Sequence, residues 1–244
     1  MKLSVVIPAR DEAGSIAGTL KGLAATLSSN SIPHEIIVVD DGSSDGTADA
    51  VARVAASYCG VRLVENPGPH GFGLAIRFGI SHATGDAVAI VMADASDDPS
   101  DLVSYYRKLV EGYDCVFGSR FIRGGRVIDY PGHKLVLNRL ANWFIKFIFR
   151  LDFNDTTNAF KCYRREAIAG MQPLISPHFN LTVEMPLKAI VRGFSYAVVP
   201  IKWTNRASGV SKLKIKEMGS RYLFICLYLW LEKYFSRGDY RKKS

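Results

Sequence analysis

The stretch EIIVVDDGSSDGTADAVARVAAS (residues 35–57) joins an apolar run, a polar turn and a helical segment in direct succession. The run Glu35–Val39 is typical of a strand buried on both faces, and Gly46–Ser57 is long enough for an amphipathic helix. The same succession recurs through the first half of the chain. Further strands are expected at Leu3–Pro8, Val61–Glu65, Asp86–Ala93 and Asp114–Gly118, and further helices at Ser15–Ser28, Phe72–His82 and Ser100–Gly112. This alternation predicts an α/β fold with a Rossmann-like, mostly parallel sheet flanked by helices.

The composition is that of a globular protein, because 48% of the 244 residues are hydrophobic and 22% are charged. Residues 1–118 carry 8 Lys and Arg against 15 Asp and Glu, whereas residues 119–244 carry 23 against 8. This division indicates two binding tasks on one chain. A solvated or nucleic-acid-binding surface is the plain alternative for the basic half. The sequence has no RNA-binding fingerprint and no zinc finger, so no nucleic-acid partner is expected.

Neither a disulfide framework nor a membrane span is expected. The four cysteines lie far apart without a CxxC motif, which indicates reduced thiols in a cytosolic protein. The start, MKLSVVIPARDE, becomes charged after one short apolar run and is unlike a signal peptide. The longest apolar run, Tyr222–Leu231, would rise ~15 Å as a helix, which is about half of a bilayer core.

Polar clusters follow three of the expected strands: residues 9–12 (ARDE), 40–43 (DDGS) and 94–98 (DASDD). Ligands bind at the carboxyl ends of the strands in open sheets of this kind. Asp40 and Asp41 could form a turn and helix cap, but two adjacent carboxylates can also accept hydrogen bonds from a nucleobase or ribose. Asp94 is suited to Mg²⁺ or Mn²⁺ together with substrate phosphates. Asp97 or Asp98 is expected to cap the helix that Pro99 opens.

The Gly-rich segment Asn66–Gly73 is a weaker candidate. It lacks the GxxxxGK[ST] pattern, and Ile76 stands where GxGxxG requires glycine. It is therefore expected to be a structural loop. The alternative is a loop that lies beside the ligand-binding site at the strand ends.

Seven motifs follow one another from about residue 3 to residue 216: VVIPARDE (5–12), VVDDGSSDGT (38–47), MADASDDP (92–99), GSRF (118–121), DTTNAF (155–160), YRRE (163–166) and RASGVSKL (206–213). By the order and spacing of these motifs, the chain resembles the family 2 nucleotide-sugar glycosyltransferases of the GT-A fold. More narrowly, it resembles the polyprenyl-phosphate hexose synthases, among them the dolichol-phosphate mannose synthases.

The resemblance implies a role for each matching position. It places Pro8, Ala9, Arg10 and Glu12 beside the nucleotide, Asp40 or Asp41 on its base or ribose, and Arg206, Ser211 and Lys212 in a loop over the donor diphosphate. Asp94 would be the metal ligand, and Arg120 and Lys134 would face the acceptor phosphate. Met92 departs from the family, because it stands where the first Asp of the DxD motif is common. Metal coordination must then depend on Asp94, the donor phosphates and water, with at most one flanking carboxylate.

The implied reaction is the inverting transfer of a hexose, with mannose favoured, from a GDP- or UDP-sugar to a polyprenyl phosphate. Two alternatives remain open. One is a family 2 enzyme acting on a sugar or lipid hydroxyl, although the processive QxxRW motif is missing. The other is a non-catalytic nucleotide-sugar-binding accessory subunit, which Met92 supports.

A lipid acceptor without a spanning segment implies docking at the membrane surface, and we expect a peripheral protein on the cytoplasmic face. The chain divides into a catalytic domain, 1–216, and an apolar helix with a basic tail, 217–244. In the helix Lys134–Arg150, the residues Lys134, Asn138, Asn142, Lys146 and Arg150 form a polar stripe, and Trp143, Phe144, Ile145, Phe147, Ile148 and Phe149 fill the rest. This pattern predicts an interfacial helix, with a core helix as the alternative. Tyr222–Leu231 should be buried in lipid, in a partner or against this helix. A homo-oligomer and a membrane partner subunit both remain open.

Overall fold

The computed structural model describes residues 1–205 and 215–242. Its core is a seven-stranded sheet in the order β3-β2-β1-β4-β7-β5-β8. The strands are β1 (Leu3–Ala9), β2 (His34–Asp40), β3 (Val61–Glu65), β4 (Ala87–Ile90), β5 (Cys115–Ser119), β7 (Lys161–Arg164) and β8 (Tyr196–Pro200). Only β7 runs antiparallel to its neighbours. The expected α/β fold with a mostly parallel sheet is therefore confirmed.

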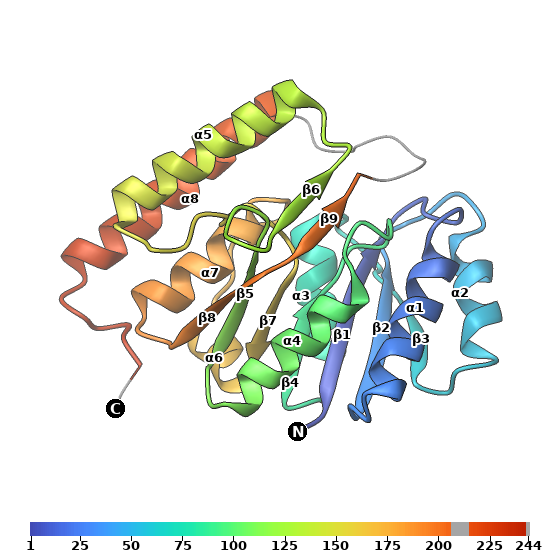
Figure 1. Ribbon diagram of the computed structural model, residues 1–244. Helices are drawn as coiled ribbons and strands as arrows, with labels where there is room; N and C mark the ends of the chain where they lie inside the picture. The colour runs from blue at the N-terminus through green and yellow to red at the C-terminus, as the bar shows by residue number, and fades with distance from the viewer. Residues whose placement is uncertain (206–214, 243–244) are drawn as a thin grey trace.

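Helices cover both faces of the sheet (Figure 1). The helices α1 (Ile16–Ser29), α2 (Thr47–Ala55) and α4 (Pro99–Val110) share one core with alternate residues of β1, among them Leu3, Val5 and Ile7. The other face packs on α3 (Phe72–His82), α6 (Arg165–Gly170), α7 (Leu181–Val191) and α8 (Ile215–Phe235). Continuous apolar strands are what two covered faces require.

The carboxyl ends of β1, β2, β4 and β5 meet at one edge of the sheet, because these four strands are parallel to one another. Above this edge lies a second, two-stranded sheet of β6 (Arg126–Ile128) and β9 (Lys202–Thr204). The apolar pattern of Tyr196–Trp203 is typical of one strand, but the structure divides this segment between β8 and β9. β8 pairs with β5 and β9 pairs with β6, and the break falls at Ile201, which hydrogen-bonds both Ser119 and Arg126.

The helix α5 (Gly132–Phe149) runs beside α8 on the outside of the molecule (Figure 1). The polar stripe predicted for this helix does not lie wholly at the surface, because Asn142 is 1% exposed. Ile145 and Phe149 are buried as well, whereas Phe147 is 72% exposed. The helix therefore buries Asn142 together with apolar residues and presents aromatic residues to the outside.

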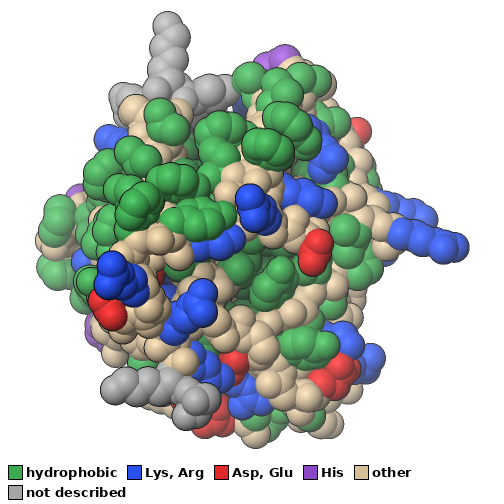
Figure 2. All heavy atoms as spheres, turned by 90° about the vertical axis from the view of Figure 1, so that its left-hand side faces the viewer, with side chains coloured by type: hydrophobic (Ala, Val, Ile, Leu, Met, Phe, Trp, Pro, Cys, Tyr) green, Lys and Arg blue, Asp and Glu red, His purple; other side chains and the backbone are tan. Residues whose placement is uncertain are grey.

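The outer surface of α5 and α8 is predominantly apolar. Its exposed side chains are Val136, Leu137, Leu140, Trp143, Phe144 and Phe147 of α5 and Leu223, Phe224, Leu227, Leu231, Tyr234 and Phe235 of α8. Figure 2 shows hydrophobic side chains gathered in the upper part of this side of the molecule, with Lys and Arg among and below them. The inner residues of α8, such as Ile225 and Leu229, are buried. Of the helices that the structure describes, none combines the length and apolarity needed to cross a membrane.

Candidate active site

The loops after β1 and β2 are tied together at the sheet edge. The backbone N–H of Glu12 donates to Thr47 Oγ1 at 2.9 Å, and Asp11 Oδ1 accepts from the N–H of Ser44 at 2.7 Å. The structure therefore brings the predicted nucleotide-side residues together: Pro8, Ala9, Arg10, Glu12, Asp40 and Asp41. This grouping follows from the parallel register, in which Pro8 and Ala9 lie beside Val39 and Asp40.

The two adjacent aspartates have different surroundings. Asp41 is 5% exposed and accepts hydrogen bonds from Asn66 Nδ2 at 2.7 Å and from Gly71 N at 2.8 Å, so its carboxylate holds the Gly-rich loop in place. Asp40 Oδ1 accepts from the backbone N–H of Ser43 at 2.9 Å. Among the described residues, Asp40 Oδ2 has no hydrogen-bond partner. Asp40 is therefore the better placed of the two to accept a hydrogen bond from a base or ribose.

The segment after β4 carries the metal candidate. Asp94 is 8% exposed, and its Oδ1 accepts from the backbone N–H of Ser96 at 3.1 Å. Asp98 is the cap of α4, since it accepts from the N–H of Ser100 at 2.9 Å. The alternative that Asp97 caps this helix is wrong. Asp97 turns inward, is 7% exposed, and accepts from the N–H of Met92 at 3.1 Å.

Asp97 is an unusual buried carboxyl. Burial raises its pKa to about 7, and the charge of Asp94 adds to the shift. Its Oδ1 and the nearby Ser96 Oγ have no hydrogen-bond partner among the described residues. These orphaned oxygens lie within three residues of Asp94. Oxygen atoms are the ligands of Mg²⁺ and Mn²⁺, and such ions need only one or two carboxylates when substrate phosphates complete the shell.

The raised pKa gives a testable pH dependence. The folded protein keeps the Asp97 proton between about pH 4 and pH 7, whereas the unfolded chain loses it, so stability falls as pH rises through this range. Between pH 5 and pH 8, we expect the free energy of unfolding of the wild type to fall by about 2–3 kcal/mol relative to that of the Asp97→Asn variant. Urea unfolding in EDTA at both pH values measures the difference. Parallel pH profiles of the two proteins would contradict the shift.

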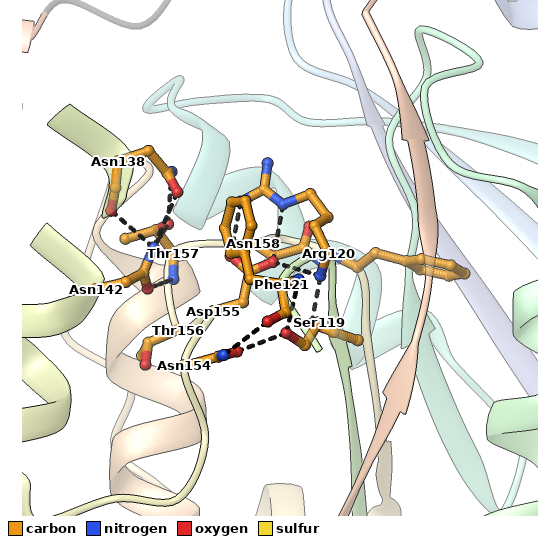
Figure 3. A network of polar contacts seen from close by, with 12 residues as sticks. Ser119, Arg120, Phe121, Asn138, Asn142, Asn154, Asp155, Thr156, Thr157 and Asn158 are labelled. Carbon is orange, nitrogen blue, oxygen red and sulfur yellow. Dashed lines mark hydrogen bonds and ion pairs between the residues drawn. The ribbon is translucent and has the colours of Figure 1, made fainter. Parts of the chain in front are cut away.

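Arg120, directly after β5, is held by a buried ion pair (Figure 3). Its Nε and Nη2 donate to Asp155 Oδ2 and Oδ1 at 2.8 and 2.7 Å, and its backbone N–H donates to Oδ2 at 2.9 Å. Arg120 is 7% exposed and Asp155 is fully buried. Burial alone would lower the pKa of Arg120, but the carboxylate of Asp155 reverses the shift and raises it. The guanidinium therefore stays charged in a fixed position.

The loop that carries Asp155 is fastened on both sides. Thr157 Oγ1 accepts from the side-chain amides of Asn138 and Asn142, both at 2.9 Å, and Thr157 N–H donates to Asn142 Oδ1 at 3.1 Å (Figure 3). The loop is also held by the buried Lys161 of β7, whose Nζ donates to the backbone oxygens of Thr156, Asn158 and Thr182. Burial lowers the pKa of Lys161 to about 7. The loop thus links α5 to the position of Arg120.

The remaining predicted residues are placed as follows. Lys134 lies in the first turn of α5, four residues before Asn138 and hence on the same helix face. It makes no hydrogen bond or ion pair within the described ranges.

Trp203 connects the two halves of the site. Its backbone forms an isolated β-bridge with Asp97, and the centre of its ring lies 5.8 Å from the guanidinium carbon of Arg120. Arg206, Ser211 and Lys212 lie outside the described residues.

A groove of about 1130 Å³ lies between α5 and α8. Apolar side chains such as Trp143, Phe147 and Trp230 line most of it, while Arg139 and Asn154 lie where it meets the Arg120 loop. Asn154 precedes Asp155 in its loop and contacts the segment that carries Arg120, since its amide donates to the backbone oxygen of Phe121 at 3.1 Å. An apolar groove therefore adjoins the buried arginine.

Comparison with known proteins agrees with this architecture. Residues 4–170 match the sequence profile described as glycosyl transferase family 2. The chain therefore belongs to glycosyl transferase family 2, and it is a glycosyltransferase. The predicted family is confirmed.

Two relatives are similar over much of the chain. Polyprenol monophosphomannose synthase of Mycolicibacterium smegmatis is 33% identical over 184 residues, which cover 73% of this chain and 69% of the relative. Glycosyltransferase AglD of Haloferax volcanii is 30% identical over 229 residues, which cover 91% of this chain and 36% of the relative. The chain thus spans only about a third of the length of AglD.

The fold is shared with glucosyl-3-phosphoglycerate synthase from Mycobacterium tuberculosis, solved in complex with Mn²⁺, UDP-glucose and phosphoglyceric acid. The TM-score is 0.72 at 18% sequence identity, and the match covers 94% of this chain and 79% of the other. The likeness shows a GT-A fold.

Proposed function

We propose that this glycosyltransferase moves a hexose, with mannose favoured, from a GDP- or UDP-sugar to a polyprenyl phosphate with inversion at the sugar carbon. The carrying observation is the position of Arg120: a charged guanidinium, fixed by Asp155 at the carboxyl end of β5, where Asn154 of the apolar groove contacts both Ser119 and Phe121. An acceptor with a phosphate and a long apolar chain matches this arrangement, because the phosphate suits the guanidinium and the chain suits the apolar groove. The similarity to the polyprenol monophosphomannose synthase supports the same acceptor class.

A phosphate acceptor removes the need for a general base. Its attacking oxygen is already anionic near pH 7, because the second pKa of a phosphate monoester is about 6. The chain must instead bring two anions together against their repulsion. Arg120 and Lys134 would orient the attacking phosphate, and Asp40 and the loop of residues 9–12 would hold the nucleotide. Arg206, Ser211 and Lys212 would close over the donor diphosphate.

A divalent cation, Mg²⁺ or Mn²⁺, fits the donor side of this site. Asp94 would supply the carboxylate, and the orphaned oxygens of Ser96 and Asp97 lie beside it. The described residues contain no group of three His, Cys, Asp or Glu side chains that could hold a metal unaided. The cation would therefore bind together with the donor, where it would neutralise charge on the leaving diphosphate.

Assay of the pure protein with Mg²⁺ or Mn²⁺, a polyprenyl phosphate and a panel of labelled GDP- and UDP-sugars tests the proposal. Labelled glycolipid is expected with donors of one nucleotide class. A protein that binds nucleotide-sugars but yields no glycolipid with any donor would support the accessory-subunit alternative and overturn the proposal.

We further propose peripheral docking on the cytoplasmic face of a membrane, and the apolar surface of α5 and α8 supports the docking itself. We expect the Phe144→Ser, Phe147→Ser double variant to bind anionic vesicles at least about tenfold more weakly, since burying one Phe contributes about 1.5–3 kcal/mol. Transfer to long-chain acceptors should slow, whereas transfer to a short, water-soluble polyprenyl phosphate should be spared. Vesicle sedimentation and the two assays measure these effects.

Val110→Ser is the matched control, because Val110 is 61% exposed but ends α4 at the opposite edge of the sheet. It should leave vesicle binding unchanged. Recovery of the unmodified protein entirely in the supernatant, with activity independent of lipid and detergent, would contradict membrane docking.

A further inference from the structure

Two arginines share one aromatic ring beside the acceptor site. The guanidinium carbon of Arg120 lies 5.2 Å from the centre of the Phe121 ring, and that of Arg139 lies 4.3 Å from it. Both distances fall within the range of cation–π contacts. Arg120 comes from the end of β5 and Arg139 comes from α5, so the ring brings together cations that lie on separate elements.

Both guanidinium groups are charged, but they differ in whether a carboxylate compensates that charge. The charge of Arg120 is compensated by its bidentate pair with Asp155. Arg139 is exposed, and no carboxylate within the described part of the chain lies within ion-pair distance of it. A phosphate monoester carries about −1.5 to −2 charges at pH 7, so a neutral ion pair alone can supply hydrogen bonds but little net attraction. The uncompensated charge must come from other cations nearby.

The orientation of Arg139 is fixed by its neighbours in α5. Asn138 and Asn142 bind Thr157, which sets the rotation of the helix against the Asp155 loop. Arg139 also lines the groove between α5 and α8 at the place where Asn154 joins the Arg120 loop. Its guanidinium therefore lies at the apolar groove and beside the ring that Arg120 also contacts, where it would meet the phosphate of a lipid phosphate bound in the groove.

We propose that Arg139 is a binding residue for the acceptor phosphate. Phe121 acts as the spacer that holds Arg139 beside Arg120, and Arg139 supplies positive charge that the Arg120–Asp155 pair cannot. Guanidinium groups are suited to this task because their planar donors match phosphate oxygens. The inference rests on the proposed acceptor class, and it adds a cation that neither Arg120 nor Lys134 replaces.

The test uses a short, water-soluble polyprenyl phosphate, so that attraction to a membrane plays no part. We expect Arg139→Gln to raise the KM for this acceptor at least about tenfold while the KM for the nucleotide-sugar changes less than about twofold, because only the phosphate contact is lost. Arg139→Lys should restore part of the affinity, since it keeps the charge but loses the planar donors.

Arg53→Gln is the matched control. Arg53 is also an exposed arginine on a helix, but it lies in the last turn of α2, on the side of the sheet away from α5 (Figure 1). Its variant should leave both KM values unchanged. Equal effects of Arg139→Gln and Arg53→Gln, or no effect of either, would overturn the proposal.

Calorimetric titration of the same acceptor into each protein separates this inference from the proposed function. If the wild type binds the acceptor but transfers no sugar, the proposed function fails while the comparison of Arg139→Gln with the wild type still decides the role of Arg139. Weaker binding by the variant alone supports it, and equal binding overturns it.

Discussion

Replacing Asp94 by Ala should reduce sugar transfer at least about a thousandfold, because removing the charge stabilisation of a leaving group costs several kcal/mol of transition-state energy. Asp94 is the one carboxylate after β4 that both matches the family motif and lies beside orphaned oxygens. Met92 cannot share the task, since a thioether is a poor ligand for Mg²⁺ or Mn²⁺. Steady-state transfer and Mn²⁺-dependent binding of the nucleotide diphosphate measure the loss.

Asp98→Ala is the control for this prediction. Asp98 caps α4 through the N–H of Ser100, so its variant should lose about 1 kcal/mol of stability and keep its turnover. Near-normal turnover of Asp94→Ala would show that the metal assignment is wrong. Equal losses in both variants would show that the segment contributes through its conformation alone.

Replacing Arg120 by Ala should lower kcat/KM for the polyprenyl phosphate at least about a hundredfold, which corresponds to about 2.7 kcal/mol, and leave donor binding nearly unchanged. The variant should also be destabilised by about 3–5 kcal/mol, because Asp155 would remain buried without its partner. Calorimetry with the nucleotide-sugar and kinetics with varied acceptor separate the two effects.

The double variant Arg120→Met, Asp155→Leu separates catalysis from folding. Replacing both members of a buried ion pair by apolar residues often restores stability. We therefore expect this variant to unfold near the wild-type denaturant concentration and still transfer poorly. An equal loss of sugar-nucleotide affinity in Arg120→Ala would place Arg120 on the donor side. Unchanged transfer in both variants would show that Arg120 contributes to the fold and not to transfer.

The sequence was sufficient to predict β1 to β5, because strands buried on both faces have a continuous apolar pattern. It did not predict the antiparallel strand β7, which has only four residues and is charged at both ends. It also predicted which loops meet, since parallel strands end at one edge. It did not separate Asp97 from Asp98 as the cap. Either residue suits the position before Pro99, and only the inward turn of Asp97 towards Met92 decides between them.

The orientation of α5 was harder to predict for a physical reason. This helix has exposed aromatic side chains as well as buried apolar ones, so it has no clear amphipathic pattern and its asparagines resemble part of a solvated stripe. The structure shows that Asn138 and Asn142 face Thr157 instead. The partner lies 15 or more residues away and is separated by a loop, and no local spacing indicates such a contact. The stacking of Arg139 on Phe121 depends on the same docking.

The proposal that the acceptor is a phosphate is tested most directly with two acceptors that differ only in their head group. A polyprenyl phosphate and the polyprenol of the same chain length are offered to the wild-type protein with the active nucleotide-sugar and Mn²⁺. Because no general base is needed for an anionic oxygen, we expect transfer to the phosphate and less than about 1% of that rate to the alcohol. Equal or faster transfer to the alcohol would contradict the proposed phosphate acceptor and would identify an enzyme that acts on a hydroxyl group.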